Sequence, residues 1–276
     1  MKREDKLEQL KQYIRKLDRV AIAFSGGVDS TFLLKIAYQV LGERVIAVTA
    51  VSELSPGWEA EQARHLARLI GSSQLEIRGD ELNIQEFSRN GADRCYYCKQ
   101  YRFSRILEIA REKGISYVAD GSNYDDLQDF RPGRKAAREL GILSPLEETG
   151  MTKAEVRFFS KEMGLPTWDQ PSFACLASRI NYGQEITREK LKRVEVAEDF
   201  LRELGFKQLR VRVHGEIARI EVAAEEREKF FSTDLLDRIS NRLKEIGFVY
   251  VTLELGGYRT GSMNQVLIMG GERNGY

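Results

Sequence analysis

One short string, SGGVDST at residues 25–31, constrains the fold of this 276-residue chain more than any other feature. It follows an apolar run, Val20 to Phe24, and precedes a helix-like pattern, Phe32 to Ala37. The order is therefore strand, glycine turn and helix, and the glycines allow both a sharp turn and close approach of the backbone to a ligand. Free N–H groups and the positive dipole end at a helix start suit an anion. We expect an anion-binding loop here.

No lysine follows the second glycine of this string, so it is not a Walker-type phosphate loop. It resembles instead the pyrophosphate loop (PP-loop) of enzymes that split ATP into AMP and pyrophosphate. A chance glycine turn is the alternative, but the string lies where the mechanism needs it. Asp29 is a candidate ligand for the Mg²⁺ that accompanies ATP. The loop residues expected to bind ATP are Ser25, Gly26, Gly27, Asp29, Ser30 and Thr31.

Strands and helices alternate through the first half of the chain, which predicts an α/β fold with a parallel sheet and helices on both faces. Ligands of such sheets bind beyond the carboxyl ends of the strands. This rule places the glycine loop, the strand end at Ala50–Ser52 and the loop Asp120–Asn123 around one crevice. Asp120 and Asn123 either contact the nucleotide there or serve only their own turn. The expected strands are residues 20–24, 44–51, 74–77 and 117–119, and the expected helices include 58–70 and 99–113.

The pattern changes after an irregular, proline-containing segment at residues 165–183. The residues beyond it predict a small α+β domain, with helices at 187–204 and 235–246 and strands at 209–213, 217–222 and 248–255. We expect a PP-loop ATP pyrophosphatase domain, similar to adenine nucleotide alpha hydrolases, at residues 1–170. We expect a smaller substrate-binding and oligomerisation domain at residues 184–276.

The composition of the chain argues against nucleic-acid and membrane partners. Lys plus Arg number 43 and Asp plus Glu 42, so the chain lacks the basic excess of a typical nucleic-acid binder. No apolar run approaches a membrane span, and the first residues are too charged for a signal peptide. We therefore expect a cytoplasmic protein with no nucleic-acid or membrane partner.

The three cysteines are an odd number, which makes a poor disulfide framework and favours thiolates. Cys95 and Cys98 form a C-x-x-C pair at a loop-to-helix junction, and Cys175 lies in a later loop. Three thiolates suit a soft metal or an iron–sulfur cluster, whereas structural zinc normally takes four protein ligands. A four-iron cluster with one open iron, a metal-free sulfur relay, and a zinc site or inert cysteines all remain open.

A further string, PSFACLASRI at residues 171–180, is similar to the LarE family, together with SGGVDST, DGSNYDD and LRVRVHG. The resemblance covers most of the chain. It implies an ATP-dependent sulfur transferase that adenylates a carboxylate of pyridinium-3,5-biscarboxylic acid mononucleotide and converts it to a thiocarboxylate. The product contributes to the nickel-pincer nucleotide cofactor of lactate racemase.

The resemblance also implies the source of sulfur. Some family members lack the C-x-x-C pair and give up the sulfur of the cysteine that matches Cys175. Because Cys95 and Cys98 are present, this chain resembles the members in which three cysteines hold a [4Fe-4S] cluster whose open iron carries an extra sulfide. A sulfide source and a homo-oligomeric assembly are further expectations from the resemblance.

The same resemblance assigns the substrate phosphate to Ser178, Arg210 and Arg212; a surface salt-bridge face is the alternative use of the arginines. Lys99 is expected to stabilise the acyl-adenylate or the incoming carboxylate, or else to be a solvated helix lysine. Glu198, on a charged helix, is a weak metal-ligand candidate and more typical of a solvated residue. The expected catalytic set is Cys175, Lys99 and Asp29.

Three other functions compete with this interpretation. A tRNA-thiolating PP-loop enzyme combines the same loop with three cysteines, but should show a basic surface and salt-sensitive RNA binding. An amide-forming ATP pyrophosphatase that uses ammonia would not need three thiols. A non-catalytic nucleotide sensor would release no pyrophosphate.

Overall fold

The computed structural model describes residues 2–128, 132–171 and 174–259. The chain divides into two compact units, of which the first comprises Met1–Glu81 and Cys95–Phe173 and the second Leu82–Arg94 and Ala174–Tyr276. The short segment Leu82–Arg94 therefore groups with the C-terminal residues, although its place in the sequence lies within the expected first domain. Within the described ranges, no helix has the length and apolar character that crossing a membrane requires.

The described part of the first unit contains a parallel sheet of four strands in the order β3-β2-β1-β4. This confirms the predicted α/β class. The chain steps from β1 outward to β3, then returns to place β4 on the other side of β1. The strand order thus reverses between β1 and β4, and such a reversal is where open parallel sheets bind ligands. The strands are β1 (Val20–Ala23), β2 (Val45–Val51), β3 (Ser73–Arg78) and β4 (Tyr117–Ala119).

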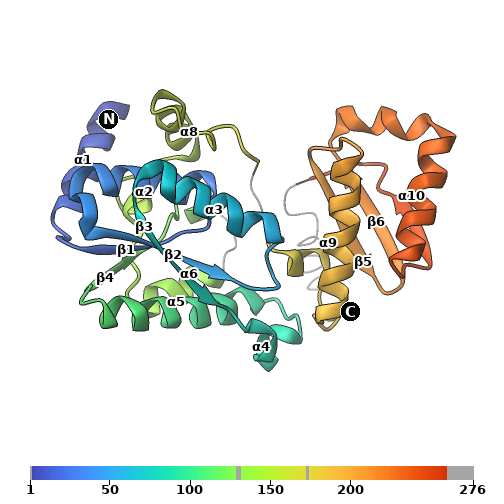
Figure 1. Ribbon diagram of the computed structural model, residues 1–276, viewed down its shortest axis with the longest axis horizontal. Helices are drawn as coiled ribbons and strands as arrows, with labels where there is room; N and C mark the ends of the chain where they lie inside the picture. Colours follow the sequence, from blue (N-terminus) through green and yellow to red (C-terminus); the bar gives the residue numbers. More distant parts are fainter. Residues whose placement is uncertain (1, 129–131, 172–173, 260–276) are drawn as a thin grey trace, which may run out of the picture. The chain divides into compact units, whose positions relative to one another are not determined.

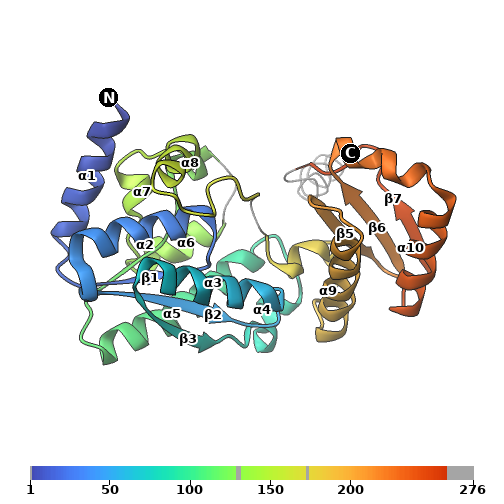
Figure 2. The ribbon, with the colours of Figure 1, turned by 45° about the horizontal axis from the view of Figure 1, so that its top comes forward.

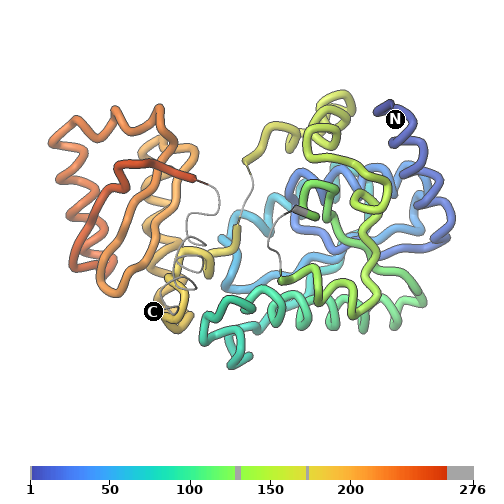
Figure 3. The backbone as a smooth tube through the Cα atoms, turned by 180° about the vertical axis from the view of Figure 1, so that it is seen from behind, coloured from blue at the N-terminus to red at the C-terminus, as the bar shows by residue number. Residues whose placement is uncertain are grey.

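Helices cover both faces of this sheet (Figures 1 and 2). The helices on one face include α1 (Arg3–Arg15), α2 (Val28–Leu41), α3 (Gly57–Ile70), α7 (Pro145–Glu148) and α8 (Lys153–Glu162), and those on the other are α5 (Arg94–Glu112) and α6 (Pro132–Glu139). Seen from behind in Figure 3, the green tube of α5 runs on the side opposite the blue tubes of α1 and α2. Short 3₁₀ turns are η1 (Gly42–Arg44), η2 (Glu81–Asn83) and η3 (Tyr124–Gln128).

Alternation along β1 supplies both apolar cores. Val20 and Ile22 pack in the same core as Leu33 of α2, whereas Ala21 packs in the core that contains Phe103 of α5. Successive side chains of a strand point to opposite faces, so a sheet covered on both sides needs a continuous apolar run. The sequence of β1 meets this requirement.

Helix α5 begins earlier than the sequence predicts, at Arg94 rather than Lys99. Cys95 and Cys98 therefore lie one turn apart on the helix itself. The packing of α6 explains the difference: a Cβ atom built on Gly133 would lie 2.8 Å from Cγ of Lys99 and 3.3 Å from the carbonyl oxygen of Cys95. This close helix contact overrides the weak local propensity of the tyrosine-rich turn.

The described part of the second unit has a three-stranded sheet in the order β5-β6-β7, formed by β5 (Leu209–His214), β6 (Ile217–Val222) and β7 (Tyr250–Leu253). This sheet confirms the predicted second α+β region. Strands β5 and β6 are antiparallel and turn at Gly215, whose φ of 60° favours glycine. The remaining elements are α4 (Gln85–Ser88), η4 (Leu176–Arg179), α9 (Arg188–Glu203), η5 (Ala224–Phe231) and α10 (Thr233–Glu245).

One buried asparagine explains why Leu82–Arg94 joins the second unit. Asn90 has no exposed surface and a φ of 60°, a conformation that asparagine tolerates better than most residues. Its side-chain amide donates hydrogen bonds to the carbonyl oxygens of Asn181 and Gln184 at 2.7 and 2.9 Å. These bonds satisfy a loop that would otherwise bury unpaired carbonyl groups.

Candidate active site

The glycine loop links β1 to α2 in the strand–turn–helix order that the sequence predicts. Gly26 has a φ of 74°, and a Cβ atom there would lie 3.3 Å from Cα of Ala63 on α3. Gly27 is the residue before α2 and has no side chain to cap the first turn. The N–H groups of that turn are thus available to an anion, as at other uncapped helix starts.

Serine hydroxyls hold the loop in shape. The Ser25 and Ser30 hydroxyls lie 3.2 Å apart, and Ser30 Oγ donates to the Gly27 carbonyl oxygen at 3.2 Å. Ser25 is exposed, whereas Ser30 and Thr31 are buried. Of the predicted hydroxyl donors, Ser25 and Ser30 line the cavity described below, whereas Thr31 is not among its lining residues.

The loop after β4 packs directly on the start of α2. A Cβ atom on Gly121 would lie 2.8 Å from the backbone nitrogen of Ser30, so only glycine permits this approach. Asp120 accepts a hydrogen bond from Ser144 Oγ at 2.8 Å, and Asn123 Oδ1 accepts one from the backbone N–H of Asp125 at 3.0 Å. Both predicted nucleotide contacts therefore also stabilise the loops that carry them.

These loops surround a polar cavity of about 530 Å³, which we call the glycine-loop cavity. Asp29 projects into it from the first turn of α2, and its Oδ2 atom pairs with Lys153 Nζ at 2.5 Å. The Oδ1 atom is buried and has no hydrogen-bond partner among the described residues. A buried carboxylate oxygen without a donor is suited to a metal ion or a ligand. Other lining residues are Gly27, Ser30, Lys99, Asp120 and Asn123.

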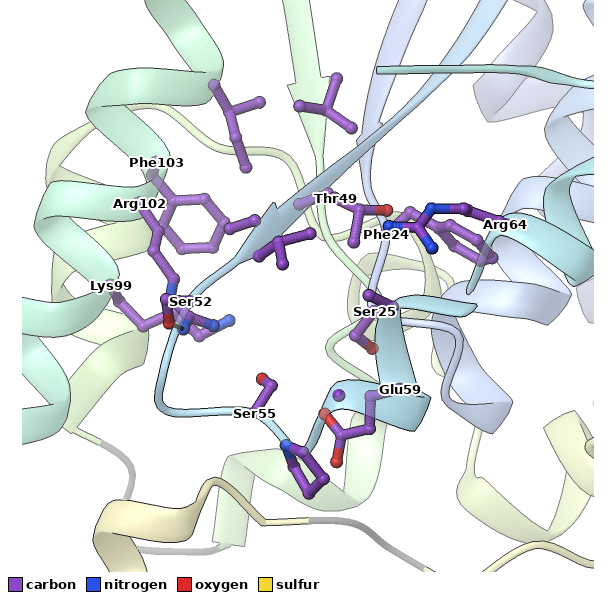
Figure 4. Close-up of a pocket in the computed structure, with 18 residues that line it drawn as sticks. Phe24, Ser25, Thr49, Ser52, Ser55, Glu59, Arg64, Lys99, Arg102 and Phe103 are labelled. Atoms are coloured by element: carbon purple, nitrogen blue, oxygen red, sulfur yellow. Dashed lines mark hydrogen bonds between the residues drawn. The ribbon is translucent and has the colours of Figure 1, made fainter. Parts of the chain in front are cut away.

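A second, more apolar cavity of about 280 Å³ lies between β2 and α5, and we call it the β2–α5 cavity (Figure 4). Phe24, Thr49 and Phe103 line it, and Figure 4 shows Lys99 and Arg102 gathered on one side of it. Ser25, Glu59 and Lys99 line both cavities. An apolar cavity with a few polar groups suits a heterocyclic base.

The second unit carries the predicted phosphate-binding residues. Arg212 donates to the carbonyl oxygen of Ser178 at 3.1 Å and to Glu221 Oε2 at 2.9 Å. Arg210 and Arg212 are 6% and 5% exposed. The structure thus brings Ser178 and Arg212 together, and the alternative of a surface salt-bridge face does not fit buried side chains.

Glu198 completes this buried group, and the expectation that it is solvated is wrong. The carboxylate has no exposed surface and accepts hydrogen bonds from Arg179 at 2.9 and 3.0 Å and from the backbone N–H of Val211 at 3.1 Å. Burial opposes its ionisation, but the positive charges of Arg179 and Arg210 and these hydrogen bonds outweigh burial and lower its pKa. The sequence held a signal: Glu198 falls on the same helix face as Val194 and Leu201.

Three buried arginines, Arg179, Arg210 and Arg212, lie with two buried carboxylates, Glu198 and Glu221, among the described residues of this unit. Burial and the neighbouring charge of Arg179 lower the pKa of Arg210 to about 10. Arg210 therefore remains a cation at neutral pH. Arg179, Arg210, Arg212, Glu198 and Glu221 are called the arginine–glutamate cluster below.

Comparison with known proteins finds a matching domain family and several similar chains. The PP-loop domain family matches residues 1–130. An uncharacterized protein of Synechocystis sp. is 45% identical over 96% of this chain and 98% of its own length. The pyridinium-3,5-bisthiocarboxylic acid mononucleotide synthase of Lactiplantibacillus plantarum is 40% identical over 92% of each chain. The chain belongs to the LarE family.

An uncharacterized protein of Methanocaldococcus jannaschii is 30% identical over 92% of this chain and 98% of its own length. The fold with its glycine loop and the synthase of L. plantarum identify this LarE-family chain as an ATP-using sulfur transferase. The predicted enzyme class is thereby confirmed.

The three cysteines of this LarE-family chain form no disulfide with one another. Cys95, which is exposed, and Cys98 lie on α5 in the first unit, whereas Cys175 precedes η4 in the second. Within residues 2–128, 132–171 and 174–259, no three His, Cys, Asp or Glu side chains gather as a metal-binding group. The predicted cluster site therefore stays a prediction.

Lys153 is a site residue that sequence analysis missed. It is the first residue of α8, directly after Thr152, whose hydroxyl accepts from the backbone N–H of Glu155 while the Glu155 carboxylate accepts from that of Thr152. This T-x-x-E capping box was visible in the sequence as a helix start. It fixes the helix terminus that presents Lys153 to Asp29.

Proposed function

We propose that this chain converts a carboxylate of pyridinium-3,5-biscarboxylic acid mononucleotide to a thiocarboxylate, in the biosynthesis of a nickel-pincer nucleotide. The named product of the L. plantarum relative supports the substrate class. The observation that carries the proposal is Asp29, which the glycine loop projects into a polar cavity with one carboxylate oxygen on Lys153 and the other unpartnered among the described residues.

ATP spans the two cavities of the first unit in this proposal. The β2–α5 cavity takes the adenosine, and the glycine-loop cavity takes the triphosphate against the first turn of α2. The unpartnered oxygen of Asp29 fits Mg²⁺, which typically uses one or two carboxylates together with substrate phosphates. The ion, when bound, neutralises phosphate charge and favours departure of pyrophosphate. Lys153 then exchanges Asp29 for a phosphate oxygen.

The first chemical step joins the substrate to AMP. A carboxylate oxygen attacks the α-phosphorus of ATP, the bond between the α-phosphorus and its bridging oxygen breaks, and pyrophosphate leaves with the electron pair. Lys99, which lines both cavities, balances the negative charge of the incoming carboxylate. The acyl-adenylate has a good leaving group, which the free carboxylate lacks.

The arginine–glutamate cluster and Ser178 hold the substrate phosphate. Arg212 already contacts the Ser178 carbonyl oxygen, and Arg210 and Arg212 carry planar guanidinium groups whose geometry matches phosphate oxygens. A contact with the phosphate selects a mononucleotide and leaves the pyridinium carboxylates of the substrate free to react.

Sulfur transfer is assigned to the three cysteines. Cys95, Cys98 and Cys175 form no disulfide, and three thiolates suit a four-iron cluster with one open iron. When bound, that cluster would carry a sulfide from a separate source. Attack of that sulfide on the activated carbonyl carbon would release AMP with the electrons of the broken carbon–oxygen bond, so no oxidant would be consumed. The second candidate makes Cys175 itself the sulfur donor.

The test uses the protein as isolated under anaerobic conditions, with ATP, Mg²⁺ and the mononucleotide. We expect AMP, pyrophosphate and a product in which sulfur replaces carboxylate oxygen; ADP and orthophosphate would contradict the proposal. Iron and sulfide analysis, with Cys95→Ser and Cys98→Ser as ligand variants, tests the cluster. Intact mass after turnover separates the two sulfur sources, because a donor Cys175 would lose the mass of H₂S.

A further inference from the structure

Glu81 is a buried carboxylate that the proposed chemistry does not use. It begins η2, after β3, and its side chain is 1% exposed. Arg102 of α5 donates from Nε to Glu81 Oε1 at 2.5 Å. A buried carboxylate needs such a partner, because burial without one is costly.

Arg102 connects this carboxylate to the wall of the β2–α5 cavity. Its Nη2 atom donates to Ser52 Oγ at 2.9 Å, and the same oxygen accepts the backbone N–H of Leu54 at 3.3 Å. Ser52 and Arg102 both line the cavity, and Figure 4 shows them side by side next to Lys99. Glu81 itself is not among the lining residues. One guanidinium thus ties α5 to the loop that follows β2.

Gly79 packs tightly against the Glu81 carboxylate and against Ser52. A Cβ atom there would lie 2.7 Å from Glu81 Oε1 and 2.9 Å from Cβ of Ser52. The backbone N–H of Gly79 donates to the Val51 carbonyl oxygen at 2.9 Å, so the glycine cannot move away from β2 easily. The carboxylate, the glycine and the loop form one packed unit.

We propose that Glu81 is a positioning residue for the nucleotide: it holds Arg102, which bridges to Ser52 and fixes the cavity wall that receives ATP. The inference rests on the proposed function, in which this cavity takes the adenosine. A planar guanidinium donates in two directions at once, and a lysine amine at the end of a flexible stem does not reproduce that bridge. The chain of contacts therefore governs ATP affinity rather than the chemical step.

The experiment measures ATP binding by calorimetry and steady-state kinetics for Glu81→Gln, Arg102→Lys and Ser52→Ala. We expect KM and Kd for ATP to rise about tenfold, the effect of one charge-assisted hydrogen bond, with kcat at saturating ATP unchanged within about twofold. Gly79→Ala leaves every charge in place and should reproduce the effect of Glu81→Gln. Arg105→Ala is the matched control, because Arg105 is on the same helix and pairs with Glu108 on the surface.

A merely structural role predicts a different pattern: a lower melting temperature and a smaller active fraction with KM for ATP unchanged, which would overturn the inference. The double variant Glu81→Gln with Ser52→Ala should raise KM no further than the larger single effect, since both act through Arg102. Additive effects would also overturn it. Wild-type protein that binds no ATP would instead overturn the proposed function, so the two failures are distinguishable.

Discussion

The glycine-loop cavity and the arginine–glutamate cluster use charge in opposite ways. Around the cavity, Asp29 is paired on one oxygen and buried without a donor among the described residues on the other. In the cluster, Glu198 accepts hydrogen bonds on both oxygens and has no exposed surface. The carboxylate of Asp29 can therefore still bind a ligand, whereas the carboxylate of Glu198 uses most of its hydrogen-bonding capacity within the fold. Substitutions in the two regions should therefore damage different properties.

The largest effect on stability is expected for Glu198→Ala. It leaves the guanidinium of Arg179, which is 2% exposed, without its carboxylate, and such a loss costs about 3–5 kcal/mol of unfolding free energy. Urea denaturation measures it. Glu245→Ala is the control, because that carboxylate forms an exposed pair with Arg242 and should cost less than about 1 kcal/mol. Equal losses of unfolding free energy in Glu198→Ala and Glu245→Ala would show that the buried cluster does not stabilise the fold more than an exposed ion pair does.

The largest effect on activity is expected for Asp29→Asn and Lys153→Met. Each should lower kcat for AMP formation by about a hundredfold, roughly the contribution of one preorganised charged group, while the unfolding free energy changes by less than about 1 kcal/mol. The pair is only partly buried, with side chains 20% and 27% exposed, so the fold does not depend on it. If either variant lost several kcal/mol of unfolding free energy, enough to leave it unfolded in the assay, the pair would instead be structural.

An intermediate effect is expected for Arg212→Lys. The charge stays, but the fork that reaches both Ser178 and Glu221 is lost, so KM for the mononucleotide should rise about tenfold. Substrate saturation curves at fixed ATP measure this. A KM that stays at the wild-type value would place the substrate phosphate elsewhere.

The smallest effect concerns pH. Burial and then the charge of Arg219 lower the pKa of His214 below its ordinary value, so the folded protein favours the neutral imidazole. Its contribution to stability is complete above pH 6.5, the ordinary value, and is lost as pH falls through the lower folded pKa. His214→Gln should flatten the fall in unfolding free energy between pH 7 and pH 5. A variant with the wild-type slope would exclude this histidine as the source.

The glycine loop was predictable because its information is local. Residues 25–31 specify the strand end, the turn and the helix start together, and the alternation of later elements fixed the parallel sheet. Lys153 lies 124 residues from Asp29, and no local sequence pattern around either residue predicts that the two side chains form an ion pair. Only the capping box before Lys153 marked its helix start.

The cluster was harder to predict because its partners come from different elements. Strand register places Arg210 opposite Glu221, while helix α9 supplies Glu198 to Arg179. A sequence pattern shows charges on a strand but not what buries them. The predicted start of α5 was wrong for a related reason: the contact with Gly133 of α6 extends the helix toward its N-terminus.

The most direct test of ATP-driven carboxylate activation uses mononucleotide labelled with ¹⁸O in its carboxylates. Adenylation transfers one carboxylate oxygen to the α-phosphorus, so mass spectrometry should find the label in AMP after sulfur transfer, with unlabelled pyrophosphate. Label in orthophosphate would show phosphorylation by the γ-phosphate, and label retained entirely in the product or released as water would show that no acyl-adenylate forms. Either result would contradict the assignment of this site as an adenylating sulfur transferase.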